Sequence, residues 1–355
     1  MHSLTPEFLD AIRLTTNQAA SLRAVGEFQG KQALYYQQAP EMLKTLRESA
    51  VIESTESSSR IEGVTVAPAR LEPLMKRTVD PRNRSEQEVA GYRDALGLIH
   101  ESAREMVFSP NVVLQLHSTL YRYMAEPGGR WKAAPNEITE TAPDGTRRIR
   151  FVPTSPHLTP LQMATLAERY ATVSNENRLD GLIRVPLAIL DFLCIHPFQD
   201  GNGRIARLLT LMLLYQHGYE VGRYISLERI IEDSKETYYE TLEASSEGWH
   251  DAQHDVLPWL EYFWGVMLRA YREFEERVHV VRDGHGAKGE QIRLAVLRRS
   301  GPFGISEIEH ECAGTSRDMV RHVMRQMRDE GLIESTGVGR GAKWRHITES
   351  DRRPE

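Results

Sequence analysis

The chain has 355 residues, too many for one small core, and its length indicates two or three domains. Its net charge of −6 excludes a protein that binds polyanions over its whole surface, so any nucleic-acid contact must come from a local basic face. Only two cysteines, no signal-like segment at the start and no apolar run of about 18 residues predict a cytoplasmic protein without disulfides or membrane contact.

The first local signal is a β-hairpin. Asp144-Gly145 separates two short alternating segments, Glu137–Thr141 and Arg148–Val152. An Asp-Gly pair between such segments favours a tight type I′ turn. We therefore expect one small hairpin in a chain whose other patterns are helical.

Apolar residues recur at a spacing of three to four over residues 161–170, 183–194 and 204–217, which predicts three helices. A glycine-rich stretch at residues 283–289 is poor in apolar side chains and predicts a linker. The fold class that follows is all-α with a small β-hairpin, followed by a separate C-terminal module.

The loop between the second and third predicted helices carries most of the chemistry. It begins at His196-Pro197, where the proline disfavours continued helical geometry in the residue before it. Asp200-Gly-Asn-Gly203 then forms a glycine-bearing turn that leads into the next helix. Backbone N–H groups at such a helix start converge on an anion, assisted by the helix dipole.

The side chains around this turn suit phosphoryl-type transfer. Arg204 and Arg207 are three residues apart, so both guanidinium groups can project from one helix face. Asp200 is a hard oxygen ligand suited to Mg²⁺, and His196 can accept a proton near neutral pH. Each feature alone has an ordinary structural explanation, but their combination in this order points to a site.

Residues 196–207, His-Pro-Phe-Gln-Asp-Gly-Asn-Gly-Arg-Ile-Ala-Arg, resemble the complete signature of the Fic family, H-x-F-x-[DE]-G-N-G-R-x-x-R. The resemblance implies that His196 deprotonates a protein hydroxyl, which attacks the α-phosphate of ATP, while Asp200 holds Mg²⁺. Relatives that act as kinases carry Ala and Lys in place of Gly201 and Gly203, which favours AMP transfer here. The residues expected to contact ATP are Gly201, Asn202, Gly203, Arg204, Ile205, Ala206, Arg207, Tyr238 and Tyr239.

A second segment, Ser58-Ser-Arg-Ile-Glu62-Gly63, resembles the family's inhibitory pattern, [ST]-x-x-x-E-[GN]. A helical Glu62 that reached Arg207 would form a bidentate ion pair and occupy the group meant for the γ-phosphate. The ordinary alternative is a helix end at which Glu62 is a surface charge and Gly63 the residue after the cap.

Two more segments follow from the resemblance. The hairpin around Asp144-Gly145 stands where the family has a flap that docks the target protein as an added strand. Tyr238 and Tyr239 resemble the family's Tyr-Tyr-x-x-Leu helix, whose tyrosines line the adenine pocket, although an aromatic pair on a helix is also common in a core. Relatives often have Asn in place of Ser246.

Cys194 lies close to His196 but on the apolar face of a predicted helix, where thiols usually pack inertly. We therefore do not expect a Cys–His nucleophile. No H-E-x-x-H motif or cysteine pair indicates zinc.

Residues from about 288 resemble the winged helix-turn-helix found behind some bacterial Fic domains. Helices are expected at residues 291–297, 305–312 and 316–330, with a wing at 337–341. The basic side chains that could contact DNA are Arg317, Arg321, Arg325, Arg328 and Arg340. Asp318, Asp329 and Glu330 on the same helix leave a protein-interaction module as the alternative.

Together these patterns divide the chain into an N-terminal helical region with the inhibitory segment (1–100), a catalytic core (101–270), a helix end and linker (271–288) and a winged module (289–355). The expected function is autoinhibited transfer of AMP from ATP, with Mg²⁺, to a Tyr, Ser or Thr hydroxyl of a target protein or of the chain itself. Two alternatives stay open: a transcriptional regulator that senses nucleotide through the core, and an enzyme that removes AMP at the same site. A homodimer is compatible with the sequence.

Overall fold

The computed structural model describes residues 2–38, 40–141, 147–176, 179–282, 287–299, 301–312, 315–336 and 342–347. The helices of the larger part are α1 (Pro6–Ala11), α2 (Thr16–Gln38), α3 (Pro40–Ile61), α4 (Pro68–Met75), α5 (Arg84–Ser102), α6 (Pro110–Leu120), α7 (Thr159–Asn175), α8 (Gly181–Ile195), α9 (Asn202–Gln216), α10 (Leu227–Asp233), α11 (Lys235–Ser246) and α12 (Leu257–Arg282), with short 3₁₀ helices η1 (Val221–Arg223) and η2 (Trp249–Asp251). The helices predicted over residues 161–170, 183–194 and 204–217 are confirmed as α7, α8 and α9. None of the described helices has the length and apolarity to span a membrane.

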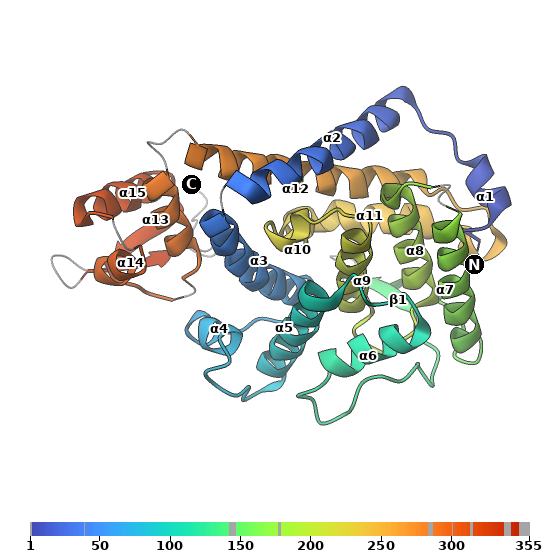
Figure 1. Ribbon diagram of the computed structural model, residues 1–355. Coiled ribbons are helices and arrows are strands. Elements are labelled where there is room, and N and C mark those ends of the chain that lie inside the picture. The colour runs from blue at the N-terminus through green and yellow to red at the C-terminus, as the bar shows by residue number, and fades with distance from the viewer. Residues whose placement is uncertain are drawn as a thin grey trace.

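Helices α8 and α9 lie at the centre of this part, surrounded by the other helices (Figure 1). All residues of α8 except Ile183 are buried, and a helix that is apolar on every side belongs in the middle of a core. Asp180 caps its start by accepting a hydrogen bond from the N–H of Leu182 at 2.7 Å. The segment that ends at His196 is therefore held on all sides before it reaches the loop.

The predicted hairpin is confirmed as β1 (Ile138–Thr141) and β2 (Arg147–Phe151). The two strands pair antiparallel, with Thr139 opposite Ile149, and the register shifts between Ile138 and Thr139. The predicted turn at residues 144–145 lies outside the described residues.

The C-terminal part has its own core. It consists of α13 (Ala287–Leu297), α14 (Ile305–Glu311), α15 (Arg317–Asp329), β3 (Ile333–Thr336) and β4 (Lys343–His346). Strands β3 and β4 pair antiparallel, and Phe303 bridges to Trp344. The sequence predicts the linker over residues 283–289, but helix α13 already begins at Ala287, so the last three of these residues are helical. Residues 283–286 and the predicted wing at 337–341 lie outside the described residues.

This C-terminal part rests against α3 and α4 (Figure 1). Arg298 donates from Nε to the Ser49 hydroxyl at 3.1 Å and from Nη1 to Glu48 at 3.3 Å. Leu294 of α13 belongs to the core of the larger part, whereas most apolar residues of α13 to β4 form a second cluster. The C-terminal part thus contacts the larger part through α3.

Helices α5 and α6 cross so closely that only glycine fits at the crossing. A Cβ at Gly91 would lie 1.9 Å from the Leu120 carbonyl oxygen, whereas a Cβ at Gly97 of the same helix would meet no atom within 4 Å. We expect Gly91→Ala to lower the free energy of unfolding by about 1–3 kcal/mol, and Gly97→Ala to raise it by about 0.5–1 kcal/mol. Thermal unfolding followed by circular dichroism measures both; equal melting temperatures for the two variants would contradict this crossing.

Candidate functional site

A cavity of about 880 Å³ opens where the α8–α9 loop, the end of α3, the hairpin and α11 meet. Its lining residues are Glu62, Glu137, Ile138, Thr139, Arg148, Arg150, Phe151, Leu190, Leu193, Cys194, His196, Gln199, Asp200, Gly201, Asn202, Gly203, Arg207, Glu236, Tyr238, Tyr239, Glu240, Leu242, Glu243 and Ser246. Its volume lies within the range of small-molecule sites in proteins. Most of the residues that the sequence singled out face it.

The loop that enters the cavity has a residue with left-handed backbone conformation at each end. His196 ends α8 with φ 50°, and Gly201 precedes α9 with φ 83°. A Cβ at Gly201 would also lie 3.1 Å from the Tyr121 ring, so glycine is required there for both conformation and space. Asn202 closes the loop, because its Oδ1 accepts from the Phe198 N–H at 2.9 Å and its Nδ2 donates to the Phe198 carbonyl at 2.8 Å.

The His196 ring is held in one tautomer. Its Nδ1 lies 3.2 Å from the Leu193 carbonyl oxygen, and because a carbonyl only accepts, Nδ1 carries the proton. Burial is the main cause that lowers the pKa of His196 to about 4. The hydrogen bond to the Leu193 carbonyl, Glu62 and Asp200 act to raise this pKa, and the Lys132 ammonium acts to lower it. The imidazole is therefore neutral at pH 7, with the lone pair of Nε2 free to accept a proton.

Arg207 and Glu62 are in contact, as the sequence predicts. Nη2 of Arg207 donates to Glu62 Oε1 at 2.8 Å, while Nε and Nη2 donate to the hydroxyl and carbonyl of Ser58 at 2.8 and 2.9 Å. The expected bidentate pairing is wrong, because only Nη2 donates to Glu62, and Nη1 of Arg207 is buried without a hydrogen-bond partner among the described residues. Glu62 is also not helical: α3 ends at Ile61, and Gly63 follows with φ 79° as the residue after the cap.

Glu62 lies directly over the start of α9. A Cβ at Gly203 would be 2.3 Å from Glu62 Oε1. The carboxylate thus occupies the space beside Gly203, in the first turn of α9. Lys235 fixes the end of α3 by donating from Nζ to the Ile61 carbonyl at 2.7 Å.

Arg204 is not brought to the cavity with Arg207. It is buried, and its Nη1 donates to Glu88 Oε2 at 2.6 Å, with Asp200 Oδ1 3.7 Å from Nη2. Among the described residues, Arg204 does not line the cavity. Arg204 thus ties α9 to α5, and Arg207 is the one of the two arginines that faces the cavity. Contact of either arginine with ATP stays a prediction.

Asp200 is an exposed carboxylate of the signature loop, with 56% of its side chain accessible. Burial would raise its pKa, but Arg204, the Tyr121 hydroxyl and the Gly201 N–H outweigh that effect, so the pKa of Asp200 is lowered and the group is ionised. No group of three or more His, Cys, Asp or Glu that could hold a metal occurs among the described residues. Asp200 can contribute one oxygen ligand.

Tyr238 and Tyr239 of α11 both line the cavity, as does Ser246. Tyr238 is buried and packs against Tyr239, with ring centroids 5.2 Å apart. Ile205 and Ala206, which the sequence placed among the ATP contacts, are buried in the core and do not line this cavity. Their register on α9 turns them away from the loop.

The hairpin is fastened to α11 by charge. Glu243 accepts from Nη2 of Arg148 at 2.7 Å and from Nε of Arg150 at 3.0 Å, and Arg150 also donates to the Tyr239 carbonyl at 2.7 Å. These contacts hold β2 against the wall that carries the tyrosines, and the exposed Ile149 faces outward.

Cys194 is buried, and burial raises the pKa of its thiol well above the ordinary value. A thiol that stays protonated is a poor nucleophile, in agreement with the expectation from the sequence.

Comparison with known proteins shows what this part of the chain is similar to. Residues 107–214 match the model of the Fic/DOC family. The chain carries a Fic/DOC family domain. Members of this family commonly transfer a nucleoside monophosphate to proteins.

Three solved structures share the fold of the chain. A Fic family protein from Desulfovibrio desulfuricans G20 is 21% identical, with a TM-score of 0.61 over 96% of this chain and 99% of that one. A Fic domain containing signaling protein from Bacteroides thetaiotaomicron VPI-5482 is 22% identical, with a TM-score of 0.60 over 70% of this chain and 94% of that one. A single-residue variant of Fic-1 from C. elegans is 19% identical, with a TM-score of 0.56 over 75% of this chain and 73% of that one.

Several residues that support the Fic loop carried no sequence signal. His117 of α6 accepts from the Gly129 N–H at 2.8 Å, donates from Nε2 to the Asp200 carbonyl at 3.2 Å, and stacks on Phe198 with ring centroids 3.8 Å apart. Glu88 is a second such residue, because it accepts from both Arg204 and Arg84. A lone His or Glu on a helix has too many ordinary explanations to be singled out without these long-range contacts.

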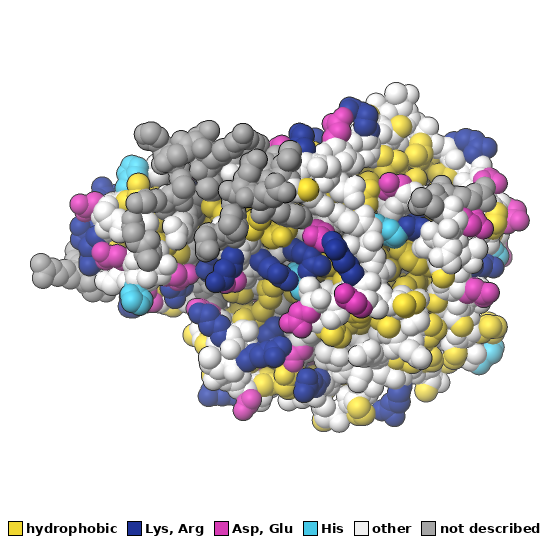
Figure 2. Space-filling view, in the orientation of Figure 1, with side chains coloured by type: hydrophobic (Ala, Val, Ile, Leu, Met, Phe, Trp, Pro, Cys, Tyr) yellow, Lys and Arg dark blue, Asp and Glu magenta, His cyan; other side chains and the backbone are white. Residues whose placement is uncertain are grey.

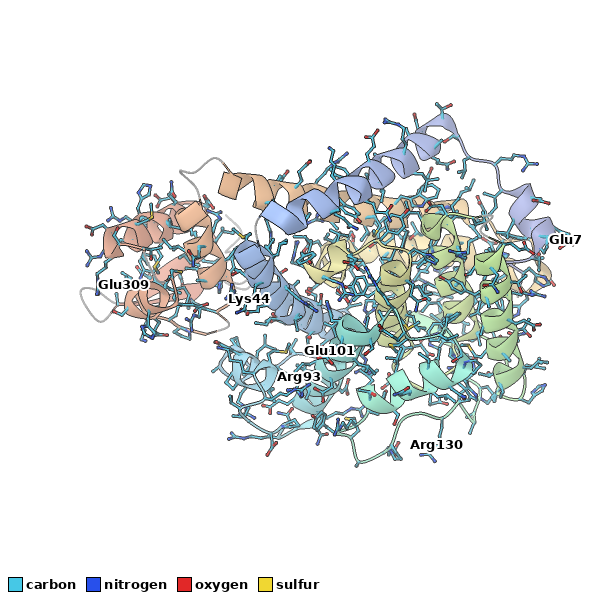
Figure 3. All side chains as sticks on the ribbon, viewed as in Figure 1. Glu7, Lys44, Arg93, Glu101, Arg130 and Glu309 are labelled. Atoms are coloured by element: carbon cyan, nitrogen blue, oxygen red, sulfur yellow. The ribbon has the colours of Figure 1, made fainter. Side chains whose placement is uncertain are left out.

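The arginines expected to contact DNA lie mostly in ion pairs. Arg317 is 3.3 Å from Glu309, Arg321 is 3.3 Å from Asp318, and Arg328 is 2.8 Å from Asp329. Arg325 is exposed on the same helix, and Arg340 lies outside the described residues. Basic and acidic side chains are interspersed on the visible face of this part in Figure 2, and Glu309 is labelled on it in Figure 3. DNA contact by these arginines stays a prediction.

Proposed function

We propose that this chain transfers AMP from ATP to a hydroxyl group of a protein, its own included, and that Glu62 inhibits the transfer. The observation that carries the proposal is the convergence of three elements on one cavity: a neutral His196, the start of α9 at Gly201–Gly203, and the tyrosine pair of α11. In this proposal His196 is the base, the start of α9 binds the phosphates, and the tyrosine pair lies against the adenine. The likeness to Fic proteins supports the same reaction class.

In this proposal the phosphates of ATP lie against the backbone N–H groups at the start of α9, and Arg207 binds their outer end. The target hydroxyl donates its proton to Nε2 of His196. Its oxygen forms a bond to the α-phosphorus, and the bond from that phosphorus to the α,β-bridging oxygen breaks. Pyrophosphate leaves, and the target carries AMP as a phosphodiester, so atoms and charge balance.

The residues present fit Mg²⁺ as the metal. Asp200 is exposed and ionised, and Mg²⁺ is usually held by one or two carboxylates together with substrate phosphates and water. A metal held there would neutralise charge on the phosphates. Asp200 is itself kept in place by its hydrogen bond from the Gly201 N–H at 2.6 Å.

Inhibition follows from the position of Glu62. Its carboxylate lies over Gly203 and holds Arg207, so it occupies the region proposed for the outer phosphates. Two negative groups cannot share that region at low cost. ATP would then bind in an unproductive position or displace Glu62.

The proposal that the C-terminal part is a winged helix is supported by its order of elements, three helices followed by an antiparallel strand pair. It packs against α3, the helix whose end leads into the inhibitory segment.

The proposed reaction is tested by incubating the Glu62→Gly protein with Mg²⁺ and ATP labelled at the α- or the γ-phosphate. Label should enter protein from the α-position only. Label from the γ-position would show phosphate transfer instead, and label from neither, in the presence of host lysate, would overturn the proposal.

A further inference from the structure

Four consecutive carbonyl groups of the Fic loop, those of residues 195–198, all accept hydrogen bonds from one short segment before the hairpin. Lys132 donates from its backbone N–H to Pro197 at 2.9 Å and from Nζ to Ile195 at 3.1 Å. Asn136 donates from Nδ2 to His196 at 3.4 Å and to Phe198 at 3.0 Å. The two side chains are linked, because Lys132 Nζ donates to Asn136 Oδ1 at 2.7 Å.

These carbonyls need partners. The last carbonyls of a helix have no partner within the helix, and the left-handed turn at His196 prevents the chain from continuing α8. Lys132 is only 4% exposed, so water is largely excluded from its side of the loop. An ammonium group at a helix C-terminus is also favoured by the helix dipole.

A buried lysine is costly unless its charge is hydrogen-bonded. Burial lowers the pKa of Lys132 to about 8, so the group stays mainly charged at pH 7, and a carbonyl and an amide oxygen accept its hydrogen bonds. Arg130, two residues earlier and labelled in Figure 3, is exposed, so the same segment offers a basic residue without this role.

We propose that Lys132 and Asn136 are positioning residues for His196: they fix the carbonyl groups of residues 195–198 and thereby aim the imidazole into the cavity. The proposal rests on the proposed function, in which His196 acts on the target hydroxyl. It adds that the base depends on a segment outside the Fic signature, at the root of the hairpin expected to bind the target.

Lys132 also acts on the charge of His196. The charged groups that face the imidazole are Lys132 from this segment, Glu62 from the end of α3 and Asp200 from the loop itself. Removal of the ammonium removes a positive charge that lowers the pKa of His196, so this pKa should rise whether or not Glu62 is present. The acid limb of the pH–rate profile should therefore move to higher pH.

The test compares Lys132→Met, Lys132→Arg, Asn136→Ala and the control Arg130→Met, each combined with Glu62→Gly so that activity is measurable. We expect kcat for AMP transfer to fall by about 10- to 100-fold in Lys132→Met and Asn136→Ala, since a misplacement of about 1 Å can cost that much. The KM for ATP should stay within about twofold, because the start of α9 is unchanged. Lys132→Arg should recover part of kcat, and Arg130→Met should match the parent.

A second measurement does not depend on activity. In nucleotide-free protein with ¹³C-labelled histidine, the His196 resonance, assigned with His196→Gln, should titrate at higher pH in Lys132→Met than in wild type or Arg130→Met. If Glu62→Gly shows no transfer at all, the proposed function fails while this titration still decides the role of Lys132.

Two results would overturn the positioning role. One is an unchanged kcat in both Lys132→Met and Asn136→Ala. The other is a loss of kcat that equals the loss of folded protein or of ATP affinity, together with an unmoved His196 titration, because a purely structural brace would behave in that way.

Discussion

Replacement of His196 by alanine is expected to lower the rate of AMP transfer by about 10²- to 10⁴-fold, the usual contribution of a general base. ATP binding should persist, because the groups proposed to bind the phosphates, the backbone of Gly201–Gly203 and Arg207, are not changed by the substitution. Label transfer from α-labelled ATP gives the rate, and calorimetry gives the affinity.

The pH dependence provides the companion measurement. Since the pKa of His196 is lowered to about 4, the neutral base is present through the neutral range, and activity should fall only as acid protonates it. Bound phosphates will raise that pKa, so the fall should occur at higher pH in the nucleotide complex than in free protein. His196→Ala activity above about a tenth of the wild-type rate would remove histidine from the role of base.

Replacement of Glu62 by glycine is expected to raise auto-AMPylation by about 10- to 100-fold, the equivalent of one charged hydrogen bond of about 1.5–3 kcal/mol. The reason is that Arg207 and the space over Gly203 become free for the outer phosphates. Initial rates of label transfer at fixed ATP and Mg²⁺ measure the change.

Matched variants separate inhibition from general loosening of α3. Glu62→Gln keeps the size of the side chain but removes its charge, and should activate less than Glu62→Gly. Arg207→Ala should remain inactive with or without Glu62→Gly, because both act through one contact. An unchanged rate in Glu62→Gly would dismiss autoinhibition, and a lost rate would favour removal of AMP as the reaction, with Glu62 orienting a water.

The sequence predicts the parts of this site whose pattern is local. The periodicity of residues 183–194 and 204–217 locates α8 and α9, and the Asp-Gly pair locates the hairpin, because helix and turn signals lie within a few residues of one another. The loop from His196 to Arg207 is predicted for the same reason.

What sequence could not predict depends on contacts between distant segments. Arg204 and Arg207 look alike on a helix face, yet Glu88 draws one into the core, while Ser58 and Glu62 hold the other at the cavity. Whether an arginine faces a ligand or a buried carboxylate is decided by the neighbouring helix, and local spacing carries no information about that neighbour.

Helix α3 connects the C-terminal part to the cavity. Ser49, near the middle of α3, accepts a hydrogen bond from Arg298 of the C-terminal part. Ser58, near the end of α3, accepts one from Arg207, about 14 Å away along the axis at ~1.5 Å per residue. Binding free energies are reciprocal. A partner of the C-terminal part and a nucleotide that favour the same position of α3 must therefore each increase the affinity of the other by the same factor. A nucleotide titration monitored at the C-terminal part would thus report on the cavity, and the reverse titration must give the same coupling constant.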